Sequence, residues 1–107
     1  MSPKRRFRLI YAPEVKQHLK AIERKYHALI RAEIEARLQL EPDLETRNRK
    51  PLVRRIAFEA EWELRLGPNN RFRVFYTIDR DQGDVCILAI GVKERNRLFV
   101  GGEEVEL

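Results

Sequence analysis

The sequence predicts an α+β fold, a small β-sheet of the antiparallel type with two N-terminal helices packed on one face. One short strand-like run comes first, a helical apolar stripe follows, and further strand-like runs fill the second half. Two neighbouring runs there, residues 62–66 and 72–78, are apolar at every second position, which is typical of half-buried strands. The length of 107 residues suits one hydrophobic core, so we expect a single domain spanning residues 1–107.

The first half of the chain contains the opening strand and the helices. Residues 7–11 are predicted to form a short strand, and Pro13 then suits the first turn of a helix, where its missing N–H is not needed. From residue 15 to residue 38, apolar residues recur at steps of three or four, which places them on one helix face. No glycine or proline interrupts this stretch, so the sequence leaves open a helical hairpin or one long bent helix.

The two alternating runs are predicted to form a β-hairpin, because a short Gly-Pro-Asn-Asn segment at residues 67–70 joins them. If their apolar residues share one face, Leu66 must lie opposite Phe72, since a slip of one residue would expose one of the two sets. This register places Arg65 directly across from Arg73. Like charges in such positions destabilise a sheet by roughly 0.2–1 kcal/mol. The arrangement therefore favours an anion that both side chains hold, and the alternative is two solvated arginines that point apart.

Three further segments complete the chain. Residues 43–55 show no periodicity and predict a loop, which is either solvated or folded so that its cations lie beside the hairpin. Residues 85–92 are apolar on both faces, which is typical of a central strand covered on both sides. The acidic end, residues 103–106, either folds back on the basic face or extends into solvent, and the sequence does not decide between the two.

The composition limits the kinds of function. A formal net charge of +5 favours a polyanionic partner such as nucleic acid. No apolar run approaches the roughly 20 residues of a membrane span, and the basic N-terminus lacks the apolar stretch of a signal peptide, so we expect a cytoplasmic protein without membrane contact. One cysteine, two histidines and scattered acids do not make a zinc site, and there is no glycine-rich phosphate loop. We therefore expect no metal and no cofactor.

A basic face of this kind can bind RNA or cleave it. Cleavage needs no metal when the adjacent 2′-hydroxyl is the nucleophile, provided that the protein holds the phosphate and stabilises its growing charge. Arg65 and Arg73 are the predicted phosphate clamp, because guanidinium groups are planar and permanently charged. Lys93, Glu63 and Glu94 are the titratable candidates for the proton transfers, although Glu63 faces the same way as Arg65 and suits a local ion pair equally well. The cations expected to contact RNA phosphates around them are Arg47, Arg49, Lys50, Arg54, Arg55, Arg71 and Arg95.

The chain resembles the RelE/ParE superfamily of bacterial toxins from type II toxin–antitoxin pairs. The resemblance rests on the WELRLG, RVFY and IGVKER segments, at residues 62–67, 73–76 and 90–95, which follow an opening strand, helices and a basic loop. It implies a microbial-ribonuclease-like domain, which in the RelE branch cleaves messenger RNA in the ribosomal A site. It also implies a cognate antitoxin whose extended or helical segment wraps the toxin and blocks the basic face, with a heterotetramer as one arrangement of the pair.

The resemblance also implies roles for individual residues. Arg73 matches the family's phosphate-stabilising arginine, and Lys93 takes the place of a second family arginine. Arg65 stands where RelE-type toxins have a catalytic lysine, and Glu63 replaces another such lysine two residues earlier. Phe99 replaces a tyrosine that has an acid–base role in the family, so that phenolic proton is missing here. General acid–base catalysis typically contributes about 10²–10⁴-fold in rate.

Three functions therefore stand as alternatives. The first, which the sequence favours, is a toxin that acts as a metal-independent, ribosome-dependent mRNA endoribonuclease, with an antitoxin, the ribosome and mRNA as partners. The second is a ParE-like toxin that inhibits DNA gyrase and needs no catalytic residues. The third is a non-toxic module that binds an antitoxin or RNA.

Overall fold

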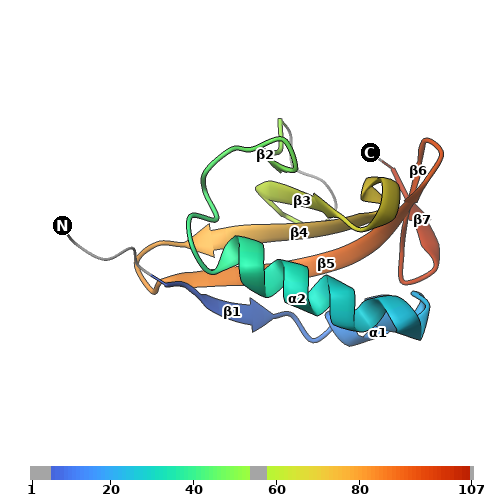
Figure 1. Cartoon of the computed structure of the whole chain (residues 1–107), viewed down its shortest axis with the longest axis horizontal. Coiled ribbons are helices and arrows are strands. Elements are labelled where there is room, and N and C mark those ends of the chain that lie inside the picture. Colours follow the sequence, from blue (N-terminus) through green and yellow to red (C-terminus); the bar gives the residue numbers. More distant parts are fainter. Residues whose placement is uncertain (1–5, 54–57, 107) are drawn as a thin grey trace.

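The computed structural model describes residues 6–53 and 58–106, and Figure 1 shows how its elements are arranged. Within these residues the sheet has seven strands, in the order β2-β3-β4-β5-β6-β7, and β1 pairs with β5. The β1–β5 pair is parallel, and the other neighbours are antiparallel. The strands are β1 (Arg8–Tyr11), β2 (Arg49–Pro51), β3 (Trp62–Leu66), β4 (Phe72–Asp79), β5 (Asp84–Glu94), β6 (Arg97–Val100) and β7 (Glu103–Val105). The predicted α+β fold with a mainly antiparallel sheet is confirmed.

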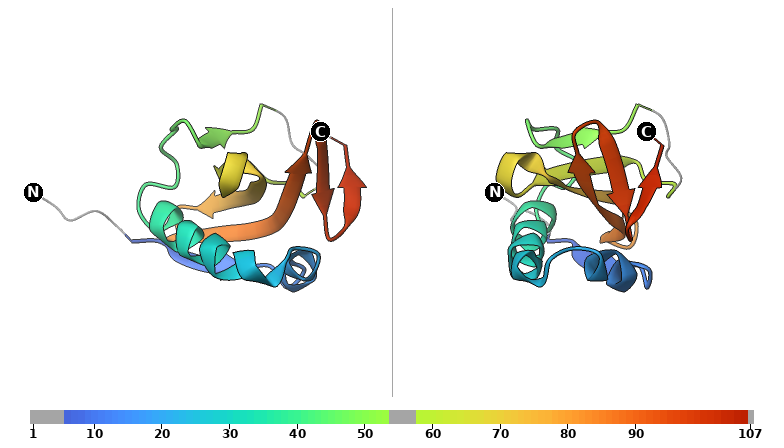
Figure 2. Two further views of the ribbon diagram at one scale, coloured as in Figure 1. Left: turned by 45° about the vertical axis from the view of Figure 1, so that its right-hand side comes forward. Right: turned by 90° about the vertical axis from the view of Figure 1, so that its right-hand side faces the viewer.

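The helices of the N-terminal half lie on one side of the sheet, as Figures 1 and 2 show. They are α1 (Val15–Lys20), the short 3₁₀ helix η1 (Arg24–Tyr26) and α2 (His27–Leu38). The imidazole Nε2 of His27 lies 2.8 Å from the carbonyl oxygen of Leu19 and 2.9 Å from that of Ile22. Both carbonyls lie at or just after the end of α1, so this side chain ties the start of α2 to the end of α1. The stretch is therefore a pair of helices and not one long bent helix.

The helices cover the sheet face that carries the alternating apolar residues of the hairpin. Leu66 lies opposite Phe72 and Trp62 lies opposite Tyr76, which confirms the predicted register. The Tyr76 hydroxyl donates a hydrogen bond to the carbonyl oxygen of Pro42, at 2.7 Å, and so fixes the loop that follows α2. The buried residues shared by the sheet and α2 on this side are Leu64, Leu66, Phe72, Val74, Tyr76, Ile30, Ile34 and Leu38.

Strand β5 is central, with β4 on one side and β1 and β6 on the other. Val85, Ile87 and Ile90 pack in the helix-side core, whereas Ala89 belongs to a smaller apolar cluster on the opposite face. The register between β4 and β5 shifts just after Phe75, so Ile87 and Ile90 face the same way although they are three residues apart. The predicted central strand is confirmed, and it contributes apolar side chains to a cluster on each face, which fits a sequence without alternation.

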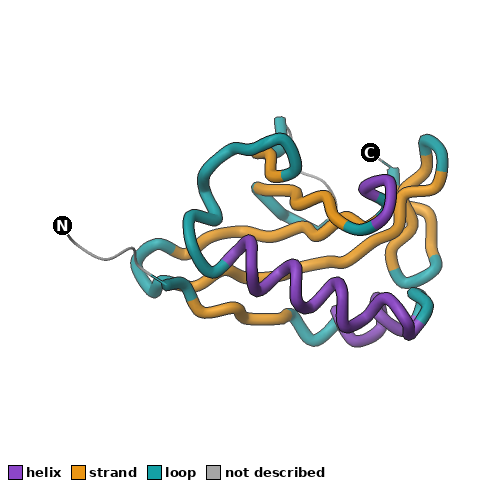
Figure 3. Tube along the Cα trace, in the orientation of Figure 1, coloured by secondary structure: helices purple, strands orange, loops and turns teal. Residues whose placement is uncertain are grey.

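Two segments that the sequence left as irregular contain strands, as Figure 3 shows. The loop predicted for residues 43–55 was wrong at residues 49–51, which form β2 at the edge of the sheet. Residues 103–105 of the acidic end form β7, which pairs with β6. Across this pair, Glu104 Oε2 lies 3.8 Å from Arg97 Nε. No helix in the described part of the chain is long and apolar enough to cross a membrane.

Candidate functional site

Arg65 and Arg73 lie directly opposite each other on β3 and β4, as their register predicts. Because side chains alternate along a strand, they point to the sheet face away from the helices. Glu63 lies on the same face, two residues before Arg65. We call this surface the arginine face and define it by Glu63, Arg65 and Arg73.

The carboxylate of Glu63 lies between the two guanidinium groups. Arg65 donates from Nε to Glu63 Oε1 at 2.8 Å, and Arg73 Nη1 lies 3.5 Å from the same oxygen. Glu63 is only 7% exposed, so its charge is compensated inside the protein. Of the two roles open for Glu63 from the sequence, proton transfer and a local ion pair, the structure shows the ion pair. The internal carboxylate therefore supplies the negative charge that the facing arginines need.

The two arginines differ in their access to solvent. The Arg73 side chain is 11% exposed and that of Arg65 is 40% exposed. Burial lowers the pKa of Arg73, while Glu63 acts in the opposite direction, and Arg73 Nε also donates to the carbonyl oxygen of Asn70 at 3.0 Å. Arg73 is thus held by internal acceptors, and the alternative of two solvated arginines that point apart is wrong for it.

A second group of cations lines an open depression of about 520 Å³ where β4 begins and β5 ends. We call it the basic depression. Lys93 and Arg95 lie there with Arg73, beside asparagines from the turn that contains the short 3₁₀ helix η2 (Pro68–Asn70). Arg71 also reaches it, although its Nη2 lies 3.5 Å from Glu94 Oε1. The residues that line the depression are Pro68, Asn69, Asn70, Arg71, Arg73, Lys93, Arg95 and Asn96.

The remaining predicted cations are not gathered at the arginine face. Arg49 lies opposite Leu64 and points to the helix side, where it donates to the carbonyl oxygen of Leu44 at 2.7 Å and to that of Arg37. It therefore ties β2 to the end of α2. Lys50 lies opposite Glu63 in the sheet, but its ammonium group is paired elsewhere, with Nζ 3.6 Å from Glu45 Oε2. Arg47 is exposed, and the predicted contacts Arg54 and Arg55 lie outside the described residues.

Phe99 does not lie on the arginine face. It is opposite Val92, which is opposite Phe72, so all three side chains point to the helix side. There Phe99 lines a cavity of about 280 Å³, the helix-side cavity, together with His18 and Tyr26. The position that the resemblance assigns to a catalytic tyrosine is thus separated from Arg73 by the thickness of the sheet.

His18 has a structural contact that the sequence did not reveal. Its Nδ1 accepts a hydrogen bond from the backbone N–H of Ile90 at 3.3 Å, in the gap on β5 between its pairing with β1 and with β6. Burial lowers the pKa of His18. Helix periodicity places His18 on α1, but no local pattern indicates a partner 72 residues away.

The arginine face offers electrostatics rather than acid–base chemistry. Arg65 and Arg73 keep their protons, so they can hold an anion but do not exchange protons readily. Within residues 6–53 and 58–106, no group of three or more His, Cys, Asp or Glu side chains is placed to hold a metal ion.

Comparisons with known proteins agree with this architecture. A family model described as "ParE toxin of type II toxin-antitoxin system, parDE" matches residues 9–97. Among solved structures, the chain is similar to one in the RelBE2 toxin–antitoxin complex from Mycobacterium tuberculosis, with a TM-score of 0.68 and 20% sequence identity. That match covers 87% of this chain and 98% of the other. No curated protein matches the chain by sequence.

Proposed function

Because the chain belongs to the ParE toxin family of type II toxin–antitoxin systems, we propose that it inhibits DNA gyrase by binding, without a catalytic step. Its natural partner is then a cognate antitoxin, and its site of action is the cytoplasm. The sequence alone favours RNA cleavage. The geometry of the arginine face supports instead the second alternative, a toxin that inhibits DNA gyrase without catalysis.

The position of Glu63 carries this proposal. A scissile phosphate held by Arg65 and Arg73 would lie next to a carboxylate that already occupies the space between them. Two like charges about 4 Å apart repel by about 1 kcal/mol in water and by about 4 kcal/mol at the lower effective dielectric near a protein surface. The phosphate would therefore meet repulsion at the point where a nuclease needs attraction.

Acid–base chemistry is also poorly supplied near this cluster. Arg65 and Arg73 cannot serve as general acids or bases readily. Glu63 is engaged with both, and Phe99 lines the helix-side cavity. A toxin that acts by occupying a surface of its target needs none of these groups. The family match and the carboxylate that contacts both arginines are thus consistent with a binding mechanism.

The basic depression favours a second candidate, ribosome-dependent cleavage of mRNA. Arg73, Lys93 and Arg95 line it together, and such a set can hold a polyanion. Lys93 would then be the group nearest to a bound phosphate that can exchange a proton. In this candidate the phosphate binds beside Arg73 on the side away from Glu63.

A supercoiling assay with purified protein tests the proposal. We expect the wild-type protein to inhibit supercoiling by gyrase and to leave mRNA intact in a translating extract, as read by toe-printing. Arg73→Ala should leave the mRNA pattern unchanged, as should the charge-matched control Arg24→Ala on η1, on the helix side of the sheet. Circular dichroism checks that each variant is folded.

Two outcomes would contradict the proposal in different ways. Codon-spaced cuts that disappear in Arg73→Ala and persist in Arg24→Ala would establish the ribonuclease. Normal growth of cells that express the chain, with neither gyrase inhibition nor cleavage, would instead establish a non-toxic binding module.

A further inference from the structure

The basic depression contains more positive charge than its neighbours compensate. Arg71, Arg73, Lys93 and Arg95 line it, and none of its described lining residues is acidic. Arg71 and Arg73 each contact one carboxylate. Within the described part of the chain, neither Lys93, which is half-buried, nor Arg95, which is exposed, forms an ion pair. An external anion can therefore compensate these two charges.

Two turns fix the backbone around the depression. In the η2 turn, the N–H of Arg71 donates to the carbonyl oxygen of Pro68 at 3.0 Å. In the turn between β5 and β6, Arg95 has a left-handed conformation with φ of 57°. The N–H of Lys93 donates to the carbonyl oxygen of Arg71 at 2.7 Å, so the strand ends beside the two turns are joined. The backbone that carries the cations is thus ordered before any anion binds, which lowers the entropic cost of binding.

The positive surface continues past the η2 turn into a second depression of about 400 Å³. Pro68 and Asn70 line both depressions, so the turn borders each of them. Arg37 and Arg65 line the second one, and Glu33, which pairs with Arg37, is the one acid among its described lining residues. Cations spread over two neighbouring depressions suit a polymer with repeated charges better than a single small anion.

The lining of the two depressions also distinguishes between kinds of nucleic acid. Among the described residues that line them, none is aromatic. Single strands are typically bound by stacking their bases on aromatic side chains. The backbone of a duplex is instead held by lysine, arginine and asparagine contacts to its phosphates. The surface therefore matches a duplex better than a single strand.

We propose that the basic depression and its continuation past η2 bind the phosphate backbone of duplex DNA. This inference rests on the proposed function, because DNA is the substrate of gyrase, and it adds a contact between the toxin and the DNA itself. Lys93 and Arg95 bind phosphates in the basic depression, and Arg65 binds one in the second depression. The space between Arg65 and Arg73, which Glu63 occupies, binds none. Because the contacts are to the backbone, affinity is independent of base sequence.

Two arginines of similar exposure provide a matched variant and control. Arg95 and Arg97 are both exposed, but Arg95 lines the basic depression, whereas Arg97 lies 3.8 Å from Glu104. Their substitutions to glutamine change the net charge equally. Each phosphate contact contributes about 0.9 to the slope of log affinity against log salt concentration. We expect Arg95→Gln to lower that slope by about 0.9 and the affinity about eightfold at about 0.1 M salt, with Arg97→Gln within about twofold of wild type.

The probe is a short, fluorescently labelled duplex DNA of mixed sequence, titrated with the purified chain at several salt concentrations and followed by anisotropy. Lys93→Gln is a second variant and should lower the slope by a similar amount. Circular dichroism checks that each variant is folded. Unlabelled single-stranded RNA of the same length and inorganic phosphate are the competitors, and both should compete more weakly than unlabelled duplex DNA.

Failure of this inference can be distinguished from failure of the proposed function. If the chain inhibits gyrase but does not bind duplex DNA, or binds it equally well in wild type and both depression variants, the DNA site is overturned and the proposed function stands. Stronger competition by RNA or by phosphate than by duplex DNA would also overturn the DNA site. If DNA binding falls as expected in Arg95→Gln but the wild type does not inhibit gyrase, the DNA site is supported and the proposed target is wrong.

Discussion

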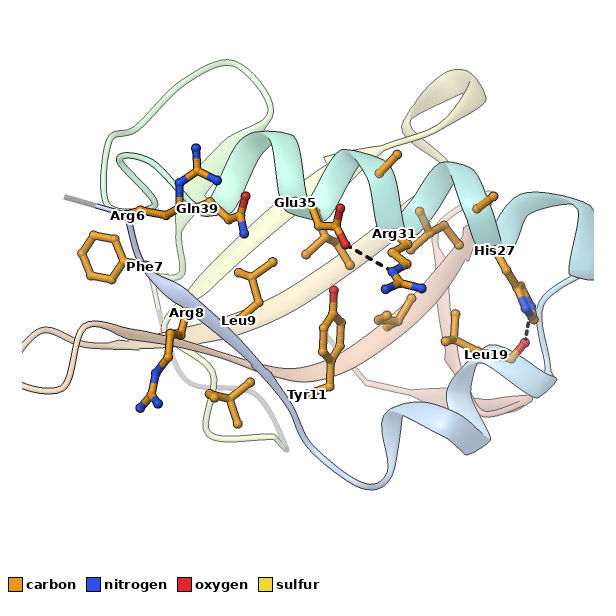
Figure 4. Close-up of a pocket in the computed structure, with 16 residues that line it drawn as sticks. Arg6, Phe7, Arg8, Leu9, Tyr11, Leu19, His27, Arg31, Glu35 and Gln39 are labelled. Carbon is orange, nitrogen blue, oxygen red and sulfur yellow. Dashed lines mark hydrogen bonds and ion pairs between the residues drawn. The ribbon is translucent and has the colours of Figure 1, made fainter. Parts of the chain in front are cut away.

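The two faces of the sheet are built from the same strands but carry different side chains, apolar ones on the helix side and charged ones on the arginine face. On the helix side, buried apolar side chains leave an open groove between α2 and β1 (Figure 4), and in the described part of the sheet β1 pairs with β5 alone. On the arginine face, three charged side chains satisfy one another. The arginines that predict chemistry are thus partly paired inside the protein. The helix side, whose pattern predicts only a core, has the larger open groove.

This difference shows that charge on a sheet face is a poor guide to reactivity until its internal partners are known. An arginine attracts an external anion only to the extent that no carboxylate is already beside it. The groove between β1 and α2, by contrast, is open among the residues that the structure describes. We therefore assign a stabilising role to the contacts of Glu63 with Arg65 and Arg73.

The largest expected effect compares two phenylalanines of equal size on opposite faces. Phe72 is fully buried in the larger, helix-side core, and Phe75 is almost fully buried in the smaller cluster with Ala60 and Leu98. Replacing a buried phenylalanine by alanine costs about 3–5 kcal/mol. We expect Phe72→Ala near the upper end and Phe75→Ala near the lower end, because the smaller cluster can relax more. Urea unfolding measures both, and a larger loss for Phe75→Ala would contradict the ranking of the two cores.

A smaller effect is expected when the cluster on the arginine face loses its carboxylate. Glu63→Gln keeps the shape but leaves Arg65 and Arg73 without a compensating charge, so we expect a loss of about 1–3 kcal/mol of unfolding free energy. The control Glu94→Gln removes a 59% exposed partner of Arg71 and should cost under about 0.5 kcal/mol.

Added phosphate or sulfate provides a further reading of the same pair of variants. An anion can take the place that Glu63 leaves, so it should restore stability to Glu63→Gln more than to wild type or Glu94→Gln. Thermal unfolding with and without sulfate measures this. Equal losses in the two variants, with no specific recovery in sulfate, would mean that the carboxylate does not hold the arginines together.

The register of the hairpin was predictable because two alternating runs and a short turn leave one pairing that buries both apolar sets. The same register places Glu63 on the face of Arg65, so the ion pair was available as an alternative interpretation. What the sequence could not give was the distance between the side chains. That distance depends on side-chain rotamers and burial. It decides whether the arginines are paired with Glu63 or can bind an external anion.

Other features depended on contacts between distant segments. Strand β2 was missed because residues 49–51 are two cations and a proline, without any apolar alternation. The side on which Phe99 points follows from the pairing of β6 with β5, which the sequence did not specify. The groove between β1 and α2 likewise depends on how α2 packs relative to β1. No local sequence pattern encodes that position.

A weaker effect is expected from pH on the helix side. Burial lowers the pKa of His18, against the opposing influence of Glu14, so the folded state favours the neutral ring. Below the ordinary histidine pKa of about 6.5, the unfolded state takes up the proton more readily, and stability therefore falls as the pH falls. His18→Asn keeps an acceptor for the Ile90 N–H but cannot titrate. Between about pH 7.5 and about pH 5.5 the wild type should lose more stability than this variant, and parallel losses would exclude His18 as the cause.

The smallest expected effect is that of restoring the hydroxyl at position 99. From the sequence alone, Phe99→Tyr should raise RNA cleavage, because it returns the phenolic proton that the resemblance implies. The fold predicts no change, since the side chain points into the helix-side cavity with His18 while Arg73 lies on the arginine face. Toe-printing and growth inhibition should therefore be the same for Phe99→Tyr and wild type, with Phe99→Leu as the matched control without a hydroxyl. Cleavage that appears in Phe99→Tyr and not in Phe99→Leu would show that the two faces are not separated in the way the β5–β6 register requires.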